Sequence, residues 1–301
     1  PAAARRPDPV VTLMDVVAAP VPAWLSAPEP TTPLAIGLAT VVAAAAWYRG
    51  SLRRSGAASA IVIGAIALRA GWAWGGFLIV WFGWVTIGSR LGRARKAART
   101  AGVVEKGAQR DAVQVMANGG VFALAAALTV WRSEWAAGAA LWGAAALAAA
   151  GADTMATEIG TWIGGTPRSI RDWRPVPAGT SGAVSGAGSA AMLGSALALS
   201  ALAVAFGLVP ARHGWVVAVA AVFGAAVDTI AGALVQHRRW CPVCETATEQ
   251  ARHSCGTDTR HRGGWRWLGN DEVNLVCTAS AALLAWILAW ILASLLTRPP
   301  A

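Results

Sequence analysis

The amino-acid sequence predicts an all-α fold, a polytopic membrane protein built as a bundle of about eight transmembrane helices. Hydrophobic residues make up 56% of the 301 positions, and the mean hydropathy is +0.50. Only 13% of the residues are charged, whereas a soluble domain carries about 25%. The chain has 17 Trp and a single Tyr, and indole rings are favourable at the depth of lipid headgroups. This composition disfavours the alternative, an Ala-rich soluble bundle.

The apolar residues fall into eight segments that follow a Pro- and Ala-rich start. Residues 1–31 contain no sustained apolar segment, so we expect a disordered tail, and Met14 is an alternative start because the sequence does not open with Met. Residues 32–298 are expected to form one membrane-embedded domain. Some segments are shorter than the roughly 20 residues of a full span, so one could be re-entrant, and the second and third could form one unit broken near Gly71. The eight segments lie at 34–48, 57–70, 72–88, 113–131, 135–152, 182–207, 214–236 and 273–297.

The basic residues indicate how these helices are oriented. The net charge is +10, and 19 of the 25 Lys and Arg residues lie in every second loop. Basic loops stay on the cytoplasmic side, so we expect an even number of spans with both termini outside, in a bacterial inner membrane. Because the charge lies in loops rather than on one soluble face, nucleic acid is not expected as a partner. The four basic loops are 49–56, 89–112, 153–181 and 237–272.

A polar stripe is expected at the start of the fourth apolar segment. In GAQRDAVQVMANGG, residues 107–120, the spacing of Asp111, Gln114 and Asn118 places them on one helical face just after Arg110. An ordinary solvated helix start would explain Asp111. It explains Asn118 poorly, because Asn118 lies more than one turn into the apolar segment.

GADTMATEIG, residues 151–160, places two carboxylates at the end of an apolar segment, where an unpartnered charge is costly. Asp153 and Thr157 are four residues apart, and Glu158 lies on a neighbouring flank. Carboxylate and hydroxyl oxygens suit a hard cation such as Mg²⁺. The alternative is a pair of carboxylates neutralised by nearby Arg residues.

A Gly-rich segment at residues 177–195 favours phosphate binding. Gly179 and Gly182 alternate with Thr180 and Ser185 just before an apolar helix. Backbone N–H groups and hydroxyls at a helix N-terminus bind phosphate well. The segment lacks the Gly-Lys-Ser/Thr of a Walker A motif, and small residues also serve close helix packing.

The last two apolar segments carry further polar residues. Asp228 lies within an apolar segment, where an Asp is a functional candidate, and Gln236 lies near the cytoplasmic end of that segment. Asn270 and Asn274 are four residues apart at the entry to the last helix, where Asp271 could simply be a helix cap. The similarity between Gly-Ala-Asp-Thr at 151–154 and Ala-Val-Asp-Thr at 226–229 reflects either chance or a distant internal repeat.

Cysteine spacing predicts a small zinc-knuckle-like loop at 237–272. Cys241 and Cys244 are followed by His253 and Cys255, and three thiolates with one imidazole could complete a tetrahedral, structural Zn²⁺ site. Reduced cytosolic thiols are the alternative. The remaining cysteine lies in the last apolar segment and is expected to pack there.

These clusters all fall near the predicted cytoplasmic face. Carboxylates on at least two helices, a cradle of small residues for phosphate and many Arg side chains are the parts that phosphoryl transfer needs. At a membrane boundary the acceptor would be a lipid with a phosphate head and a hydrocarbon tail. The donor would be a cytosolic nucleotide.

The motifs QRDAVQVMANGG, ADTMATEIG, GTSGAVS, VDTIAGALVQ, CPVC…HSCG and NDEVN together carry a family resemblance. Over about residues 34–297 the chain resembles the integral-membrane domain-of-unknown-function-92 family, which includes transmembrane protein 19 and the phytyl-phosphate kinases. The resemblance implies phosphoryl transfer from a nucleoside triphosphate, CTP or ATP, to an isoprenyl or phytyl monophosphate. One departure is Ala183, where a second Gly is expected, because Ala disfavours positive φ.

The resemblance places Asp153, Glu158, Asp228 and Asn274 in the polar site, with Gly179, Thr180, Gly182 and Ser185 beside them. From this and from the polar clusters we assign hypothetical roles to individual residues. Asp153, Glu158 and Asp228 are expected to hold Mg²⁺ and the nucleotide phosphates, while Arg110 and Arg174 neutralise developing charge. The residues expected to contact the nucleotide or phosphate groups beside them are Asp111, Gln114, Asn118, Thr157, Gly179, Thr180, Gly182, Ser185, Gln236, Asn270 and Asn274.

Two other functional classes stay open on the sequence. A small-molecule or lipid transporter or flippase would use intramembrane Asp residues and Gly-broken helices, but its site belongs near the membrane midplane. A non-catalytic membrane scaffold would dock through the zinc loop and would leave Asp153 and Asp228 far apart.

Overall fold

All eight apolar segments form α-helices. The computed structural model describes residues 28–104 and 109–296, so most of the predicted tail, residues 1–27, lies outside the described residues. The helices begin and end within a few residues of the expected positions, except that the fifth continues well beyond residue 152. Their bounds are α2 Thr32–Tyr48, α3 Arg54–Arg69, α4 Trp72–Arg90, α6 Ala112–Trp131, α7 Ala136–Ile163, α8 Gly186–Ala205, α9 Gly214–Leu234 and α10 Asn270–Leu296.

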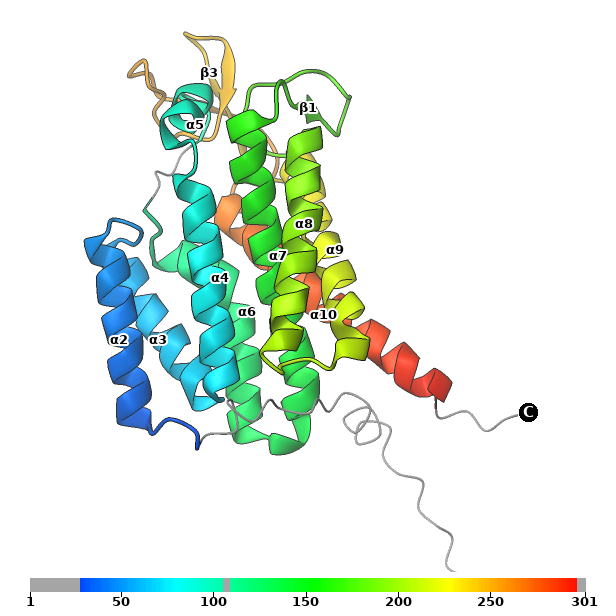
Figure 1. The fold of residues 1–301 in the computed structure, drawn as a ribbon. Helices are drawn as coiled ribbons and strands as arrows, with labels where there is room; N and C mark the ends of the chain where they lie inside the picture. Colours follow the sequence, from blue (N-terminus) through cyan, green and yellow to red (C-terminus); the bar gives the residue numbers. More distant parts are fainter. Residues whose placement is uncertain (1–27, 105–108, 297–301) are drawn as a thin grey trace, which may run out of the picture.

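Six of these helices are long and apolar enough to cross a membrane, so the expected count of eight spans is not confirmed. They are α4, α6, α7, α8, α9 and α10. The first two helices are shorter, with 17 residues in α2 and 16 in α3. Helices α3 and α4 are separate antiparallel helices rather than one broken unit (Figure 1), and Gly71, with φ of 129°, forms the turn between them.

Helix α7 is the centre of the bundle and contacts α4, α6, α8, α9 and α10. Its Ala side chains from Ala144 to Ala150 are buried. Small residues let neighbouring helix backbones approach closely where lipid surrounds the bundle. At Gly224 of α9, an added Cβ would lie 2.7 Å from the carbonyl oxygen of Cys277 and 2.9 Å from the Cβ of Ala149. The high Ala and Gly content is therefore used for close helix packing.

The helices alternate in direction, so the four basic loops lie at the same end of the bundle (Figure 1). We call this the basic end. It also carries the short polar helix α5, Arg93–Thr100, which the sequence analysis did not predict. Helix α2 begins and α10 ends at the opposite end, where the connections between helices are shorter. The structure thus confirms that the basic loops cluster together.

Two small antiparallel sheets lie at the basic end and were not predicted. Strand β1, Arg168–Ser169, pairs with β2, Ala183–Val184. The predicted zinc-knuckle-like loop at 237–272, which we call the Cys/His loop, forms a three-stranded sheet in the order β4-β3-β5. Its strands are β3 Arg238–Cys241, β4 Thr246–Thr248 and β5 Arg260–Gly263.

Candidate functional site

A cavity of about 800 Å³ opens at the basic end, between α6, α7, α8, α9 and the start of α10. We call it the polar cavity. Nearly all the residues predicted for the site line it, although they come from four helices and three loops. The predicted residues in its lining are Arg110, Gln114, Asn118, Asp153, Thr157, Glu158, Gly179, Thr180, Gly182, Ser185, Asp228, Gln236, Asn270 and Asn274.

Six carboxylates line this cavity, and Asp228 lies near two of the others. Asp153 comes from α7, Asp228 from α9 and Glu249 from the Cys/His loop. Asp228 is close enough to Asp153 and to Glu249 to be repelled by both. Its Oδ2 atom is buried and has no hydrogen-bond partner among the described residues. A buried carboxylate oxygen without a donor is costly, and a cation beside Asp228 would offset that cost.

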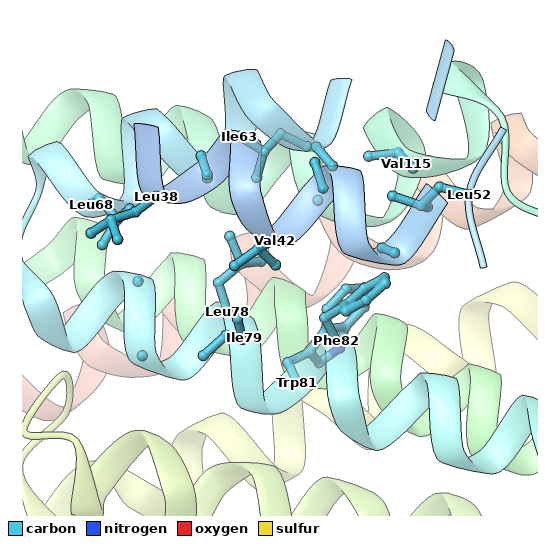
Figure 2. Close-up of a pocket in the computed structure, with 18 of the residues that line it drawn as sticks. Leu38, Val42, Leu52, Ile63, Leu68, Leu78, Ile79, Trp81, Phe82 and Val115 are labelled. Atoms are coloured by element: carbon cyan, nitrogen blue, oxygen red, sulfur yellow. The ribbon is translucent and has the colours of Figure 1, made fainter. Parts of the chain in front are cut away.

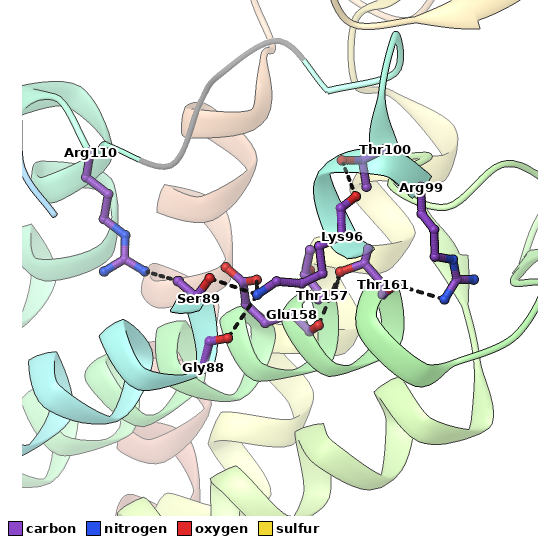
Figure 3. Close-up of polar contacts among 9 residues, drawn as sticks. All are labelled: Gly88, Ser89, Lys96, Arg99, Thr100, Arg110, Thr157, Glu158 and Thr161. Carbon is purple, nitrogen blue, oxygen red and sulfur yellow. Dashed lines mark hydrogen bonds and ion pairs between the residues drawn. The ribbon is translucent and has the colours of Figure 1, made fainter. Parts of the chain in front are cut away.

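Helix α7 continues to Ile163, ten residues beyond Asp153, so both acids of its motif lie within the helix rather than after it. Glu158 forms an ion pair with the buried side chain of Lys96 from α5 (Figure 3). The ammonium group of Lys96 also donates to the carbonyl oxygens of Gly88 and Ser89, each at 2.9 Å. Those carbonyls belong to the last turn of α4, where a cation is favourable. Lys96 therefore ties α4, α5 and α7 together beside the cavity.

The predicted stripe at the start of α6 is divided between two roles. Asp111 is the N-cap: its Oδ1 accepts from the backbone N–H of Gln114 at 3.0 Å, and the Gln114 side chain accepts from the backbone of Asp111. This is a capping box, and Asp111 is not among the residues that line the cavity. Gln114 and Asn118 do line it, with Arg110 beside them. Burial lowers the pKa of Arg110, and the negative charge of Glu158 opposes that shift.

The Gly-rich segment forms a turn that leads into α8. Gly179 and Gly182 have φ of 87° and 74°, which favours glycine at both positions. The Ser185 hydroxyl accepts from the backbone N–H of Gly188 at 3.1 Å and caps α8. Ala183 lies in β2 and is not in the left-handed region. The departure from a Gly-Gly pair at this position therefore introduces no backbone strain.

The loop that follows α9 covers the cavity with residues that the sequence analysis did not single out. The carboxylate of Glu249 accepts a hydrogen bond from the Ser181 hydroxyl and another, at 3.0 Å, from the Gln236 side chain. His237 and Arg239 also line the cavity. Burial lowers the pKa of His237, and the positive charges of Arg239, His261 and Arg266 lower it further. The imidazole of His237 is therefore neutral near pH 7.

Arg174, predicted to neutralise charge in the site, lies outside it. Its side chain is 83% exposed, and the closest carboxylate is that of Asp172 at 3.7 Å. The basic side chains that line the cavity are instead Lys96, Arg110 and Arg239. Position in a basic loop did not distinguish Arg174 from these three residues, because the distinction depends on how each loop folds.

The four predicted zinc ligands come together in the Cys/His loop. The ligand atoms of Cys241, Cys244, His253 and Cys255 all lie within 4.8 Å of one another. The Sγ atoms of Cys241 and Cys255 are 3.6 Å apart, and tetrahedral ligands with Zn–S bonds of about 2.3 Å would be roughly 3.7 Å apart. The backbone N–H of Cys244 also donates to the Sγ atom of Cys241 at 3.5 Å. The spacing of these donors fits a tetrahedral zinc ion.

The fold and the polar cavity define an integral membrane protein, a helical bundle with a polar site at one end. The family described as "Integral membrane protein DUF92" matches residues 37–282, and the chain belongs to this family.

Curated relatives in other organisms are similar over most of the chain. Protein PGR of Arabidopsis thaliana is 26% identical over 276 residues, which is 84% of this chain and 94% of that protein. An uncharacterised membrane protein of Synechocystis sp. is 29% identical over 217 residues, covering 70% of this chain and 73% of the relative. No solved structure matches the chain.

Proposed function

We propose that the protein is a membrane-bound phosphotransferase that moves a phosphoryl group from a nucleoside triphosphate to an isoprenyl or phytyl monophosphate. One observation carries this proposal. The polar cavity brings a group of carboxylates that includes Asp153, Asp228 and Glu249 together with a Gly-rich turn at a helix N-terminus and three basic side chains, all at the end of a membrane bundle. Phosphoryl transfer needs a cation clamp, oriented N–H donors and positive charge around one reacting phosphate.

In this reaction an oxygen of the lipid monophosphate forms a bond to the γ-phosphorus of the nucleotide. The bond between that phosphorus and the oxygen that bridges it to the β-phosphate breaks, and the nucleoside diphosphate leaves. A monophosphate is already ionised near neutral pH, so the acceptor needs no strong general base. The products are the lipid diphosphate and the nucleoside diphosphate.

The residues of the cavity divide naturally between these tasks. The turn from Gly179 to Ser185 offers backbone N–H groups and hydroxyls to the nucleotide phosphates. Lys96, Arg110 and Arg239 stabilise negative charge on the transferred group. Gln114 and Asn118 are neutral donors beside Arg110 and orient the acceptor phosphate.

Asp153 and Asp228 would hold a magnesium ion in this scheme. The unpartnered, buried Oδ2 atom of Asp228 and its proximity to Asp153 fit a hard cation with oxygen ligands. Glu158 is already paired with Lys96, so we assign it to positioning that lysine. When bound, Mg²⁺ would neutralise the charge of the nucleotide phosphates.

The position of the cavity also separates the rival classes. A scaffold leaves Asp153 and Asp228 apart, but they line the same cavity. A transporter site belongs near the membrane midplane, whereas this lining includes Gly179 and Glu249 from the loops of the basic end and Asn270 from the first turn of α10. Both observations favour an enzyme at the membrane boundary.

The direct test uses purified protein in detergent or nanodiscs with labelled CTP and ATP. Phytyl, geranylgeranyl and longer prenyl monophosphates are offered as acceptors, and the lipid diphosphate is separated by thin-layer chromatography. We expect label in a lipid diphosphate in the presence of Mg²⁺ and none after chelation. Absence of a labelled lipid with every donor and acceptor would contradict the proposal.

A structural zinc ion in the Cys/His loop is a second proposal. The loop contacts the membrane domain at 103–104: the backbone N–H of Glu249 donates to Val103 O at 2.8 Å, and Gln250 Nε2 donates to Val104 O at 2.9 Å. Because Glu249 also reaches into the polar cavity, an ion that orders this loop would fix one wall of the site. Metal analysis of purified protein should find about one zinc per chain.

The matched variants for zinc are Cys244→Ala and Cys277→Ala. Cys277 is buried in α10, far along the chain from the cluster, and it is not one of the four residues whose ligand atoms converge. Zinc content should fall at least tenfold in Cys244→Ala and stay unchanged in Cys277→Ala. Equal zinc content in the two variants would exclude this site.

A further inference from the structure

A second cavity, of about 550 Å³, lies between α2, α3, α4 and α6 (Figure 2). We call it the tail groove. Val42 of α2 approaches it from one side, and Leu78 and Ile79 of α4 approach it from the other. The exposed fraction of Val42 is 38%, so other helices do not cover this part of the lining. A volume between about 300 and 1,000 Å³ is typical of ligand pockets.

The lining of the tail groove is apolar except at one end. Its polar lining residues among the described parts of the chain are Arg110, Gln114 and Asn118. The same three residues line the polar cavity. The two cavities therefore meet at these side chains, and a molecule that fills both must have a polar head and an apolar body.

The length of the groove indicates what kind of apolar body fits. Its lining on α4 runs from Trp72 to Phe82, ten residue steps or about 15 Å along the helix axis. The hydrocarbon core of a bilayer is about 30 Å thick, so the groove is about as long as one leaflet is deep. The lining also includes small residues on α3 and α4, namely Ala60, Gly64 and Gly75.

We propose that the tail groove holds the hydrocarbon tail of a single-chain phosphate monoester whose head lies in the polar cavity. The proposal rests on the function proposed above, and it adds the site that receives the lipid part of the acceptor. Arg110 lies where the two cavities meet and pairs with the anionic head. Gln114 and Asn118 complete the polar side of this junction.

The groove positions the lipid more than it attracts it. The tail is already in hydrocarbon before it binds, so moving it into an apolar groove releases little free energy. Its contribution is to hold the phosphate at a fixed depth and orientation beside the reacting groups. A large side chain that fills the groove should therefore exclude the lipid tail from it without unfolding the protein.

The test is photo-crosslinking without nucleotide. The probe is dodecyl phosphate with a diazirine at the end of its chain, added to the full chain in phosphatidylcholine nanodiscs, and labelled peptides are identified by mass spectrometry. We expect label in the groove-lining parts of α2, α3 and α4, at 38–46, 60–68 and 72–82. Unlabelled dodecyl phosphate should compete, and a dodecanol probe of the same length should label these segments at least fivefold less.

Two valine variants on adjacent positions of α2 provide the matched comparison. Val42→Trp places an indole in the groove, whereas Val41 is 68% exposed and does not line the groove. Groove labelling should fall at least fivefold in Val42→Trp and stay unchanged in Val41→Trp. Equal groove labelling in Val42→Trp and Val41→Trp would overturn the proposal. Dodecanol labelling as strong as that by dodecyl phosphate would also overturn it, because the groove would then bind bilayer chains without regard to the phosphate.

This result is independent of turnover, because no nucleotide is present. Labelling of the groove by dodecyl phosphate, together with no phosphoryl transfer from any nucleotide, would leave the tail site standing and refute the kinase. Phosphoryl transfer with label elsewhere on the chain would do the reverse.

Discussion

Asp153 and Asp228 are the residues on which the proposed chemistry depends most. They come from helices α7 and α9, 75 positions apart in the sequence, and face the same polar cavity. Repulsion between two carboxylates is tolerated in a folded protein when a cation or a proton compensates it. The buried Oδ2 atom of Asp228 has no donor among the described residues, which favours the cation.

Asp228→Asn should reduce phosphoryl transfer by roughly 100-fold, the typical effect of removing one electrostatic contact to a reacting group. It should also raise the Mg²⁺ concentration needed for half-maximal activity. Asp172→Asn is the matched control, because Asp172 pairs with Arg174 outside the cavity. Initial rates against Mg²⁺ concentration measure both effects, and wild-type turnover in Asp228→Asn would remove the metal assignment.

Lys96 and Glu158 form the buried pair that connects α4, α5 and α7. The Lys96 side chain is 8% exposed, and its loss leaves a carboxylate and two helix-end carbonyls without their cation. Lys96→Met should therefore lower the free energy of unfolding by about 3 kcal/mol. The double variant Lys96→Met with Glu158→Gln should recover part of that loss, because no uncompensated charge remains.

Thermal unfolding of the wild type, the two single variants and the double variant gives the coupling between Lys96 and Glu158. Additive losses would show that the two side chains do not stabilise each other. If the double variant Lys96→Met with Glu158→Gln were stable but inactive, the pair would have a role in the cavity beyond packing.

At the scale of helices, close approach explains where glycine is required. Gly224 of α9 meets the backbone of α10 at Cys277, whereas Gly83 of α4 has nothing within 4 Å of an added Cβ. Both lie in helix interiors, so Ala gains similar helix propensity at either position. A difference in stability between Gly224→Ala and Gly83→Ala therefore reports on the packing of α9 against α10, and not on helix propensity.

Gly224→Ala should be about 2 kcal/mol less stable than Gly83→Ala, because overpacking typically costs 1–3 kcal/mol. Thermal unfolding in detergent, followed by circular dichroism, measures the difference. Equal midpoints in the two variants would mean that α9 and α10 are not in close contact.

The helices could largely be predicted from the sequence, because an apolar run of sufficient length has few alternatives in a membrane. Helix α5 was not predicted, since RARKAART is short and half of its residues are basic, and its position depends on the contacts of Lys96. Asp153 and Asp228 were found because a carboxylate in an apolar segment is unusual. Glu249 lies in a polar loop, where charge is ordinary, so nothing in the sequence marked it as part of the cavity.

For the molecule as a whole, the clustering of the basic loops at one end makes the orientation in the membrane testable. A nucleotide is supplied from the cytosol, so the proposed function requires the basic end to be cytoplasmic, as the positive-inside rule also predicts. The number of spans matters because an even number leaves both ends of the membrane domain on the same side. The six long helices alone would place the opposite end outside, and the antiparallel pair α2 and α3 adds an even number and preserves this arrangement.

Single cysteines introduced at the two ends should therefore react differently with a membrane-impermeant maleimide. The connection between α6 and α7, which contains Ser133, lies at the end opposite the basic loops, and Thr166 belongs to the basic loop that follows α7. Both residues are exposed. In intact cells Ser133→Cys should be labelled, while Thr166→Cys should gain label only after permeabilisation. The unmodified protein is the control, because the three cysteines of its Cys/His loop lie at the basic end and should stay unlabelled in intact cells. The reverse pattern would place the polar cavity on the outer face, away from cytosolic nucleotide, and would contradict the phosphotransferase while leaving the fold unchanged.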